Sequence, residues 1–254
     1  MASLPYFEPA RPRVFAHRGL ALEAPENTLL AFAHALAAGV DHVETDVHAS
    51  SDGVAVVAHD EDLSRIGGRT ERVDALTAAD LARLDLGDGQ HVPTLAEALD
   101  AFPDLRFNID LKSEASIAPT VEAIRATRAE DRVLVTSFSE QRRRAALRML
   151  PGVATSASGP RFALALATSV LRATPAVRRA LAGIHAVQIP ERARGLSTVT
   201  PARIRAFHAA GVEVHVWTVN DPDTMHRLLD RGVDGIVTDR ADLAVAVLAE
   251  RQER

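Results

Sequence analysis

Short apolar runs rich in β-branched residues alternate with longer helical patterns along almost the whole chain. Each run has the length of a strand, and the patterns between them repeat apolar residues at helical spacing. Eight strands are predicted, over residues 13–17, 42–48, 106–112, 132–138, 153–157, 186–190, 213–219 and 235–239. Helical patterns over residues 27–39, 139–150, 200–211 and 221–232 begin at Ser, Thr, Asn or Asp and end near Gly, as many helices do.

This alternation predicts an α/β fold, a (β/α)8 TIM barrel. Eight strand and helix units in 254 residues match that architecture, and 47% hydrophobic residues can fill a sizeable core. An open doubly wound sheet normally has fewer strands and a glycine-rich phosphate turn, which is missing here. We expect one domain over residues 1–254, with a small insertion at about residues 50–93 in which Asp52 and Gly53 form a hairpin turn.

Composition excludes several classes of function. The formal net charge of −5 provides no broad basic field, so we expect no nucleic-acid partner. The absence of cysteine excludes a disulfide framework, a thiol nucleophile and cysteine-ligated zinc. No uncharged apolar run approaches the roughly 18 residues of a spanning helix, and residues 1–13 lack a signal-peptide core. We expect a cytoplasmic protein without a membrane span, and the sequence does not indicate its oligomeric state.

Two apolar features have alternative interpretations. The stretch of residues 162–177 is rich in Ala, Leu and Val. An ordinary barrel helix is favoured there over an apolar surface near the barrel mouth. Trp217, the only tryptophan, lies near the end of the seventh predicted strand, where it packs in the core or lines the mouth of a pocket.

Two acids lie on one face of the second predicted strand. In the run HVETDVHAS, Glu44 and Asp46 alternate with Val43 and Val47, so the valines and the acids point to opposite faces. In a barrel the valines should face the helices and the acids the interior. Because two unpaired buried carboxylates are costly, either they shift toward neutrality or a cation lies between them. The alternative is that both acids lie at the strand end and form salt bridges with arginines.

The third predicted strand repeats this pattern. Asp110 and Lys112 lie two residues apart, and Lys112 is the only lysine among the 29 basic residues. Three converging carboxylates with water would form a hard-oxygen site suited to Mg²⁺ or Ca²⁺. The sequence therefore indicates a divalent cation held by Glu44, Asp46 and Asp110.

Two histidines are also placed at strand ends. The first strand ends in His17 and Arg18, and the insertion delivers His59 and Asp60. Asp60 either orients His59 or is a solvated loop acid. Barrel enzymes assemble their active sites at the carboxyl ends of the strands, where all these side chains are predicted to lie.

Six short motifs together resemble a known family. They are HRG at residues 17–19, PENT at 25–28, ETD at 44–46, HD at 59–60, DLK at 110–112 and WTVND at 217–221. Their order and spacing resemble the glycerophosphodiester phosphodiesterase family from about Arg13 to Asp239. The resemblance implies a TIM barrel hydrolase that needs a divalent metal ion and releases glycerol 3-phosphate and an alcohol from small glycerophosphodiesters.

The resemblance also implies roles for individual residues. Glu44 and Asp46 become metal ligands, His17 and His59 the acid-base pair, and Arg18 and Lys112 phosphate contacts, with Trp217 as a further substrate contact. One departure is Asp110, where the family usually has Glu, so the shorter side chain reaches the metal only through water or a small strand shift. Another is Ala241, where the family often has Pro; this change should affect only the local turn.

The chemistry suits these residue types. Arg18, Lys112 and the metal would neutralise the phosphodiester oxygens, while one histidine removes a proton and the other donates one. We expect His17 to be the base and His59 the acid. The reverse assignment stays open, as does attack by the substrate's own 2-hydroxyl through a cyclic phosphate.

Two other functions remain open. The first is phosphodiesterase action on lysophospholipids, as a lysophospholipase D or with the lyase-like chemistry of sphingomyelinase D relatives. The second is a barrel that only binds a phosphate ligand. The histidine pair argues against the second, because binding alone does not require two titrating groups.

Overall fold

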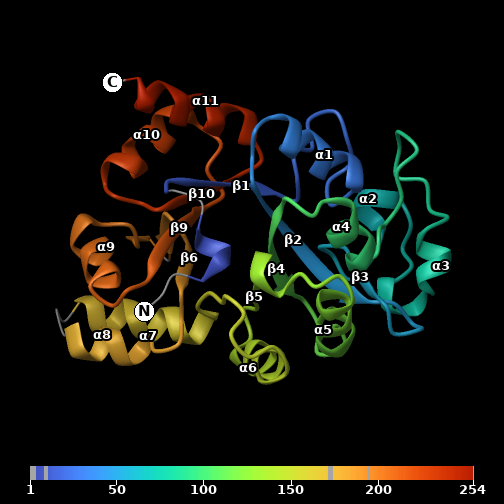
Figure 1. Ribbon diagram of the computed structural model, residues 1–254, viewed down its shortest axis with the longest axis horizontal. Helices are drawn as coiled ribbons and strands as arrows, with labels where there is room; N and C mark the ends of the chain where they lie inside the picture. Colours follow the sequence, from blue (N-terminus) through green and yellow to red (C-terminus); the bar gives the residue numbers. More distant parts are fainter. Residues whose placement is uncertain (1–3, 9–10, 171–173, 194, 254) are drawn as a thin grey trace.

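Parallel strands form one curled sheet in the computed structural model, which describes residues 4–8, 11–170, 174–193 and 195–253. The strand order is β5-β4-β2-β1-β10-β9-β6 (Figure 1). The bounds are β1 (Arg13–His17), β2 (His42–Ala49), β4 (Arg106–Leu111), β5 (Val133–Thr136), β6 (Ala186–Pro190), β9 (Glu213–Trp217) and β10 (Gly235–Thr238). These correspond to seven of the eight predicted strands.

The remaining predicted strand, residues 153–157, closes the ring between β5 and β6. It forms isolated parallel bridges from Ala154 to Leu134 and from Ser156 to Ala186, instead of a regular strand. The backbone N–H of Val135 donates to the Ala154 carbonyl at 2.9 Å. With only one bridge to each neighbour, the segment completes the predicted barrel without a continuous ladder.

Helices surround the sheet (Figure 1). They are α1 (Leu29–Ala37), α4 (Leu95–Ala101), α5 (Ile117–Ala126), α6 (Glu140–Met149), α7 (Gly159–Val170), α8 (Thr174–Ala180), α9 (Pro201–His208), α10 (Pro222–Asp230) and α11 (Ala241–Gln252), with short turns η1 (Pro5–Phe7) and η3 (Glu130–Arg132). The side chains of Thr28, Ser139, Thr200 and Asp221 accept from backbone N–H groups of α1, α6, α9 and α10. The last three caps are the predicted first residues, whereas α1 is capped by Thr28, one residue after Asn27. Of the apolar stretch 162–177, residues 171–173 lie outside the described residues. Within the described ranges, no helix is long and apolar enough to cross a membrane.

The two faces of the strands bury different residues, as predicted. Val43 and Val47 belong to the apolar core between sheet and helices. Phe15 packs inside the barrel in a separate apolar cluster. A Cβ at Gly235 would lie 2.8 Å from the Phe15 ring and 2.9 Å from His215, so only glycine fits at this point of the interior. Glu44 and Asp46 therefore face inward.

The amino end of the barrel is filled. Tyr6 of η1 is 1% exposed and packs edge-on against Phe7 and His42, with ring centroids 5.0 and 5.3 Å away. The Arg13 guanidinium lies 3.0 Å from Glu213 across the interior. A ligand can therefore enter the barrel only from the carboxyl end.

The predicted insertion follows β2. Its strand β3 (Ala55–Val57) pairs antiparallel with β2, and Gly53 adopts φ +79° in the connecting turn. The short elements α2 (Ser64–Gly67), η2 (Val73–Ala75) and α3 (Ala78–Leu81) cover a small apolar cluster that includes Val56, Leu63 and Leu81. A second short ladder joins β7 (Arg192–Ala193) to β8 (Leu196–Ser197). The insertion carries His59 back toward the barrel mouth.

Candidate active site

A cavity of about 650 Å³ lies at the carboxyl end of the barrel. The predicted site residues all line it, namely His17, Arg18, Glu44, Asp46, His59, Asp110, Lys112 and Trp217. They come from four strands and the loops that follow them. The structure therefore brings together side chains that are up to 200 positions apart in the sequence.

The turn after β1 places His17 and Arg18. Gly19 adopts φ +85°, and a Cβ at this position would lie 2.7 Å from the carbonyl carbon of Ala31 in α1. The glycine of the HRG motif is thus required by the close approach of the helix. Arg18 itself has φ +58°, and its backbone N–H donates to the Glu44 carbonyl at 2.9 Å. This turn directs the Arg18 side chain across the end of β2.

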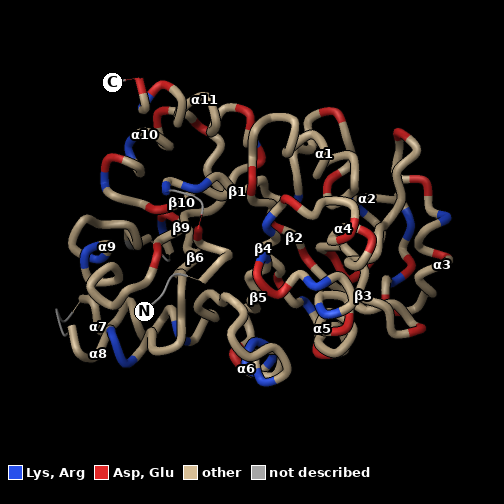
Figure 2. Tube along the Cα trace, in the orientation of Figure 1, with Lys and Arg blue, Asp and Glu red and all other residues tan. Residues whose placement is uncertain are grey.

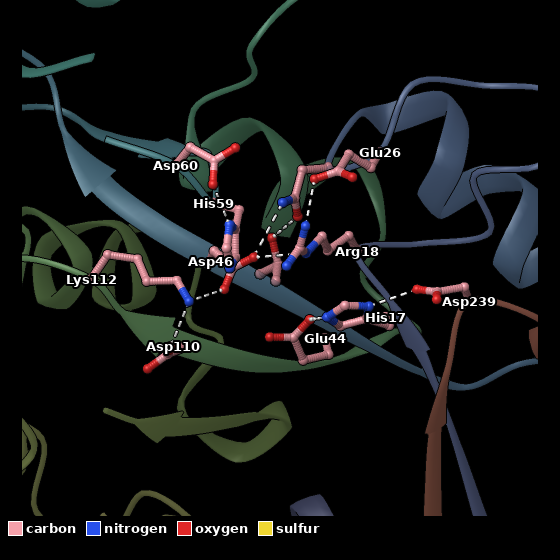
Figure 3. Close-up of polar contacts among 12 residues, drawn as sticks. His17, Arg18, Glu26, Glu44, Asp46, His59, Asp60, Asp110, Lys112 and Asp239 are labelled. Atoms are coloured by element: carbon pink, nitrogen blue, oxygen red, sulfur yellow. Dashed lines mark hydrogen bonds and ion pairs between the residues drawn. The ribbon is translucent and has the colours of Figure 1, made fainter. Parts of the chain in front are cut away.

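Lys112 bridges two of the acids. Its Nζ lies 2.7 Å from Oδ1 of Asp46 and 2.8 Å from Oδ2 of Asp110 (Figure 3). Asp46 and Asp110 are register partners on β2 and β4, which puts their carboxylates side by side. Burial opposes the charged ammonium, but the two carboxylates outweigh it and raise the pKa of Lys112 to about 12. Lys112 is therefore charged at neutral pH.

Glu44 and Asp110 each keep an unsatisfied oxygen. Glu44 Oε2 and Asp110 Oδ1 are buried and have no hydrogen-bond partner among the described residues. Burial, and secondarily the Asp46 charge, raise the pKa of Glu44 well above its ordinary value. Burial also raises the pKa of Asp110. The His17 ring lies beside Glu44, with Nε2 3.8 Å from Oε2. The site thus contains more buried carboxylate than its paired cations satisfy.

The chemistry of these acids suits a hard divalent cation, because carboxylate oxygens are the ligands that Mg²⁺ and Ca²⁺ prefer. In the part of the chain that the structure describes, however, no three His, Cys, Asp or Glu side chains converge as a metal-binding group. The Lys112 ammonium lies between Asp46 and Asp110 instead. Asp46 also forms the arginine salt bridge considered from the sequence, with Arg18 Nε 3.4 Å away. The salt-bridge interpretation therefore holds for Asp46. Among the described residues, Glu44 forms no salt bridge with an arginine.

His17 is oriented by a carboxylate. Its Nδ1 lies 2.7 Å from Oδ1 of Asp239. Hydrogen bonds from His17 and Asn220, the latter at 2.8 Å, lower the pKa of Asp239, so the carboxylate is ionised and can only accept. Nδ1 therefore carries the hydrogen, and Nε2 faces Glu44 on the other side of the ring (Figure 3). No motif in the sequence predicts this contact with Asp239.

His59 has the same arrangement. Its Nδ1 lies 2.7 Å from Oδ1 of Asp60. Burial raises the pKa of Asp60, but hydrogen bonds with His59 and Arg65 outweigh it and lower that pKa. Asp60 is therefore an ionised acceptor that orients the ring, not merely a solvated loop acid. Nε2 of His59 has no hydrogen bond with any residue that the structure describes.

Arg65 joins the insertion to the first loop. From α2 its guanidinium contacts Glu26 at 2.7 and 2.8 Å and Asp60 at 2.7 Å. Glu26 in turn accepts from Arg18 at 2.9 Å. Sequence reasoning missed both roles. Glu26 belongs to the PENT motif, which was a usable signal, whereas nothing local marks Arg65.

Aromatic side chains form the other wall of the cavity. Phe138, Phe162 and Trp217 line it together with Ala157 and Pro190. The Phe138 and Trp217 rings meet edge-on, with centroids 6.2 Å apart. Trp217 therefore lies on the pocket wall, the second of its two predicted positions. The cavity is charged on one side and apolar on the other.

A parallel barrel with two carboxylate-oriented histidines and paired basic groups at its strand ends defines an enzyme that acts on an anionic substrate. The family comparison makes this specific. The chain belongs to the glycerophosphoryl diester phosphodiesterase family, whose model matches residues 17–243. The predicted family, fold class and enzyme class are thereby confirmed.

Relatives cover nearly the whole chain. The chain is 47% identical over 240 residues to the Mycobacterium tuberculosis protein named "Probable glycerophosphodiester phosphodiesterase 2", covering 94% of this chain and 91% of the relative. It is similar to the crystal structure of glycerophosphodiester phosphodiesterase from Agrobacterium tumefaciens, with TM-score 0.77, 28% identity and coverage of 93% and 99%. It is also similar to an Oleispira antarctica phosphodiesterase solved in complex with the product sn-glycerol-3-phosphate, with TM-score 0.79, 26% identity and coverage of 94% and 97%.

Proposed function

We propose that this chain hydrolyses glycerophosphodiesters to glycerol 3-phosphate and an alcohol, using His17 and His59 as an acid-base pair. The observation that carries the proposal is the matching arrangement of the two rings. Each has Nδ1 2.7 Å from a carboxylate, and both rings line one cavity. The product found in the Oleispira antarctica relative supports the same reaction.

Arg18 and Lys112 are the proposed phosphate contacts. Both line the cavity, and Arg18 Nε is a buried donor with no hydrogen bond among the described residues. An anionic phosphodiester repels a nucleophile, so positive groups at its nonbridging oxygens lower the barrier as charge develops. A phosphate oxygen at Arg18 Nε would satisfy the free donor.

The proton transfers follow from the ring orientation. A neutral imidazole accepts a proton at Nε2 from the attacking oxygen, and a protonated one donates from Nε2 to the leaving oxygen. Asp239 and Asp60 stabilise the imidazolium form of His17 and His59, respectively. After one turnover the base holds the proton of the attacking oxygen and the acid has given its proton to the leaving oxygen, so proton exchange with water restores both rings.

A divalent cation, Mg²⁺ or Ca²⁺, is the proposed cofactor, held by Glu44, Asp46 and Asp110. When bound, it would supply positive charge to the phosphate oxygens. The two free carboxylate oxygens support this assignment, as does the burial that raises the pKa of Glu44, because a bound cation would offset the cost of a buried carboxylate. Lys112 contacts Oδ2 of Asp110, so it would share this carboxylate with the cation, which would use the free Oδ1.

The test is turnover of glycerophosphocholine by metal-loaded His17→Ala and His59→Ala, measured as release of glycerol 3-phosphate. We expect each variant to lose at least about 100-fold in kcat while circular dichroism stays unchanged. His226→Ala is the control, because this ring lies on α10 beside Glu250 and outside the cavity. Wild-type turnover in either active-site variant would remove that histidine from the proposed pair.

The apolar wall favours a second candidate function, phosphodiesterase action on lysophospholipids. Phe138, Phe162 and Trp217 offer apolar contact area for an acyl chain. The comparison is kcat/KM on lysophosphatidylcholine and on glycerophosphocholine for the wild type and Phe162→Ala. A selective loss on the lysophospholipid supports this candidate, and equal losses contradict it.

A further inference from the structure

One segment of the chain has a charge opposite to that of the whole protein. Residues 141–190 contain eight arginines and no acid, in a chain of net charge −5. Arg143 and Arg144 pair with Glu140, just before this segment. The segment includes α7 and α8, which lie side by side at the lower left of the tube view and show no red (Figure 2). This edge of the molecule is basic.

Helix α7 has an apolar solvent face. Arg161 is the only charged residue between Gly159 and Val170. The side toward the barrel buries Ala165 and Ser169, whereas Ala163, Leu164, Ala167 and Val170 are exposed at helical spacing. Leu164 is 53% and Val170 60% exposed. A surface helix normally directs polar residues to solvent, so an exposed apolar face can pack against another apolar surface.

Exposed large hydrophobic side chains concentrate in this region. Among the described residues six are exposed, and four of them, Phe138, Met149, Leu164 and Val170, lie between positions 138 and 170. Single exposed apolar residues are common, but Leu164 and Val170 share one exposed face of α7 with Ala163 and Ala167, and an apolar patch of this kind marks an interaction site. Phe138 and Phe162 also line the active-site cavity, so the apolar surface continues to its mouth.

Arginines border this face. Arg161 donates to the Ala182 carbonyl at 2.7 Å, and Arg178 to the Ala209 carbonyl at 3.0 Å. These acceptors are neutral, and neither arginine forms a salt bridge with an acid that the structure describes. Arg178 and Arg179 are exposed on α8. We call the exposed residues Phe138, Leu164 and Val170, together with Arg161, Arg178 and Arg179, the α7 surface.

We propose that the α7 surface docks on an anionic phospholipid membrane. Apolar residues bordered by arginines fit such a surface, where side chains enter the acyl boundary and arginines contact the headgroups. A second copy of this chain fits less well, because two basic faces would oppose each other. Docking would hold the cavity mouth beside the lipid, but it does not depend on the proposed reaction.

The test is co-sedimentation of the whole protein with vesicles of equal parts phosphatidylglycerol and phosphatidylcholine, compared with phosphatidylcholine alone. We expect binding to the anionic vesicles only, weakened by salt. Leu164→Glu should lower the bound fraction at least about fivefold. The matched control Leu36→Glu, on an exposed residue of α1, should stay within about twofold of wild type.

Three results would overturn the proposal. They are failure of the wild type to bind anionic vesicles, equal binding by Leu164→Glu, and a wild-type dimer that Leu164→Glu converts to a monomer. Hydrolysis of glycerophosphocholine, measured on the same samples, should be unchanged in Leu164→Glu. Loss of hydrolysis in every sample would contradict the proposed function and leave the docking result standing.

Discussion

The ammonium of Lys112 lies 2.7 Å from the Asp46 carboxylate, within a set of acids predicted to hold a metal. A second contact, to Asp110 at 2.8 Å, fixes the ammonium between two strands. Lys112 is the only lysine among the 29 basic residues of the chain. The structure supplies a reason for this exception, because a compact ammonium on a slim stem fits where a planar guanidinium needs more room.

Lys112→Arg is therefore expected to lower kcat/KM by at least about tenfold, roughly 1.4 kcal/mol of transition-state stabilisation, although it conserves charge. The broader guanidinium cannot occupy the space between Asp46 and Asp110 without displacing one of them. Steady-state kinetics on the metal-loaded variant, with circular dichroism as the check of fold, measures the effect. An activity within about twofold of wild type would show that only the positive charge matters at this position.

Metal dependence provides a second prediction. Chelation should abolish hydrolysis, and Mg²⁺ or Ca²⁺ should restore it. Binding should also raise the melting temperature, because the cation binds the folded state. Glu44→Gln should lose this thermal shift, yet the chelated variant should be as stable as chelated wild type, because Glu44 Oε2 is buried without a hydrogen-bond partner among the described residues. Full activity after chelation, or a wild-type shift in Glu44→Gln, contradicts the assignment.

The sequence predicted which strand residues face the barrel interior, because successive side chains of a strand point to opposite faces. That rule predicts that Glu44 and Asp46 face inward and Val43 outward, and the structure agrees. The helix caps could also be predicted, because a cap residue and the backbone N–H that it binds lie three residues apart. Local rules of this kind determine most of the element boundaries.

Contacts between distant residues could not be predicted in this way. His17 and Asp239 are 222 positions apart and meet only because β1 and β10 are neighbours in the closed barrel. Arg65 reaches Glu26 from an insertion whose path no periodicity specifies. The bridging position of Lys112 was missed for a different reason, since spacing gives the face of a side chain but not its partner.

Arg65 gives a third prediction. Its guanidinium contacts both Asp60, which orients His59, and Glu26, which holds Arg18. Arg65→Ala should therefore lower kcat about tenfold, an estimate from the usual cost of misplaced catalytic groups. Arg65→Lys should recover only part of this, because an ammonium lacks the planar fork.

Arg72→Ala is the matched control for Arg65. Arg72 lies in the same insertion and also contacts two acids, Glu61 and Asp74. In the described structure neither acid contacts a cavity-lining side chain, whereas Asp60 and Glu26 contact His59 and Arg18. Its kcat should stay within about twofold of wild type, since exposed ion pairs contribute little. Equal losses in the two alanine variants would mean that the insertion needs its salt bridges for folding and that Arg65 has no separate positioning role.

The last prediction concerns stability in acid. At the filled end of the barrel, Glu213 Oε2 lies 3.0 Å from both Arg13 Nε and His215 Nε2. Burial raises the pKa of Glu213, but the hydrogen bonds from His215 and Arg13 outweigh it and lower the pKa from 4.5 to about 2. The unfolded chain therefore takes up this proton first. The stabilisation is present above pH 4.5 and is lost as the pH falls toward 2.

In Glu213→Gln the free energy of unfolding should therefore fall less steeply as the pH is lowered. Urea titration at a series of pH values measures this free energy. At pH 7 the variant should be less stable by on the order of 2 kcal/mol, and the difference should shrink with acidification. Glu253→Gln is the control, because this carboxylate is exposed just beyond α11. The contrary outcome is that the free energy of unfolding falls with acid equally in Glu213→Gln and wild type. It would mean that the Arg13 and His215 contacts do not lower the Glu213 pKa enough to govern acid unfolding. Other carboxylates must then do so.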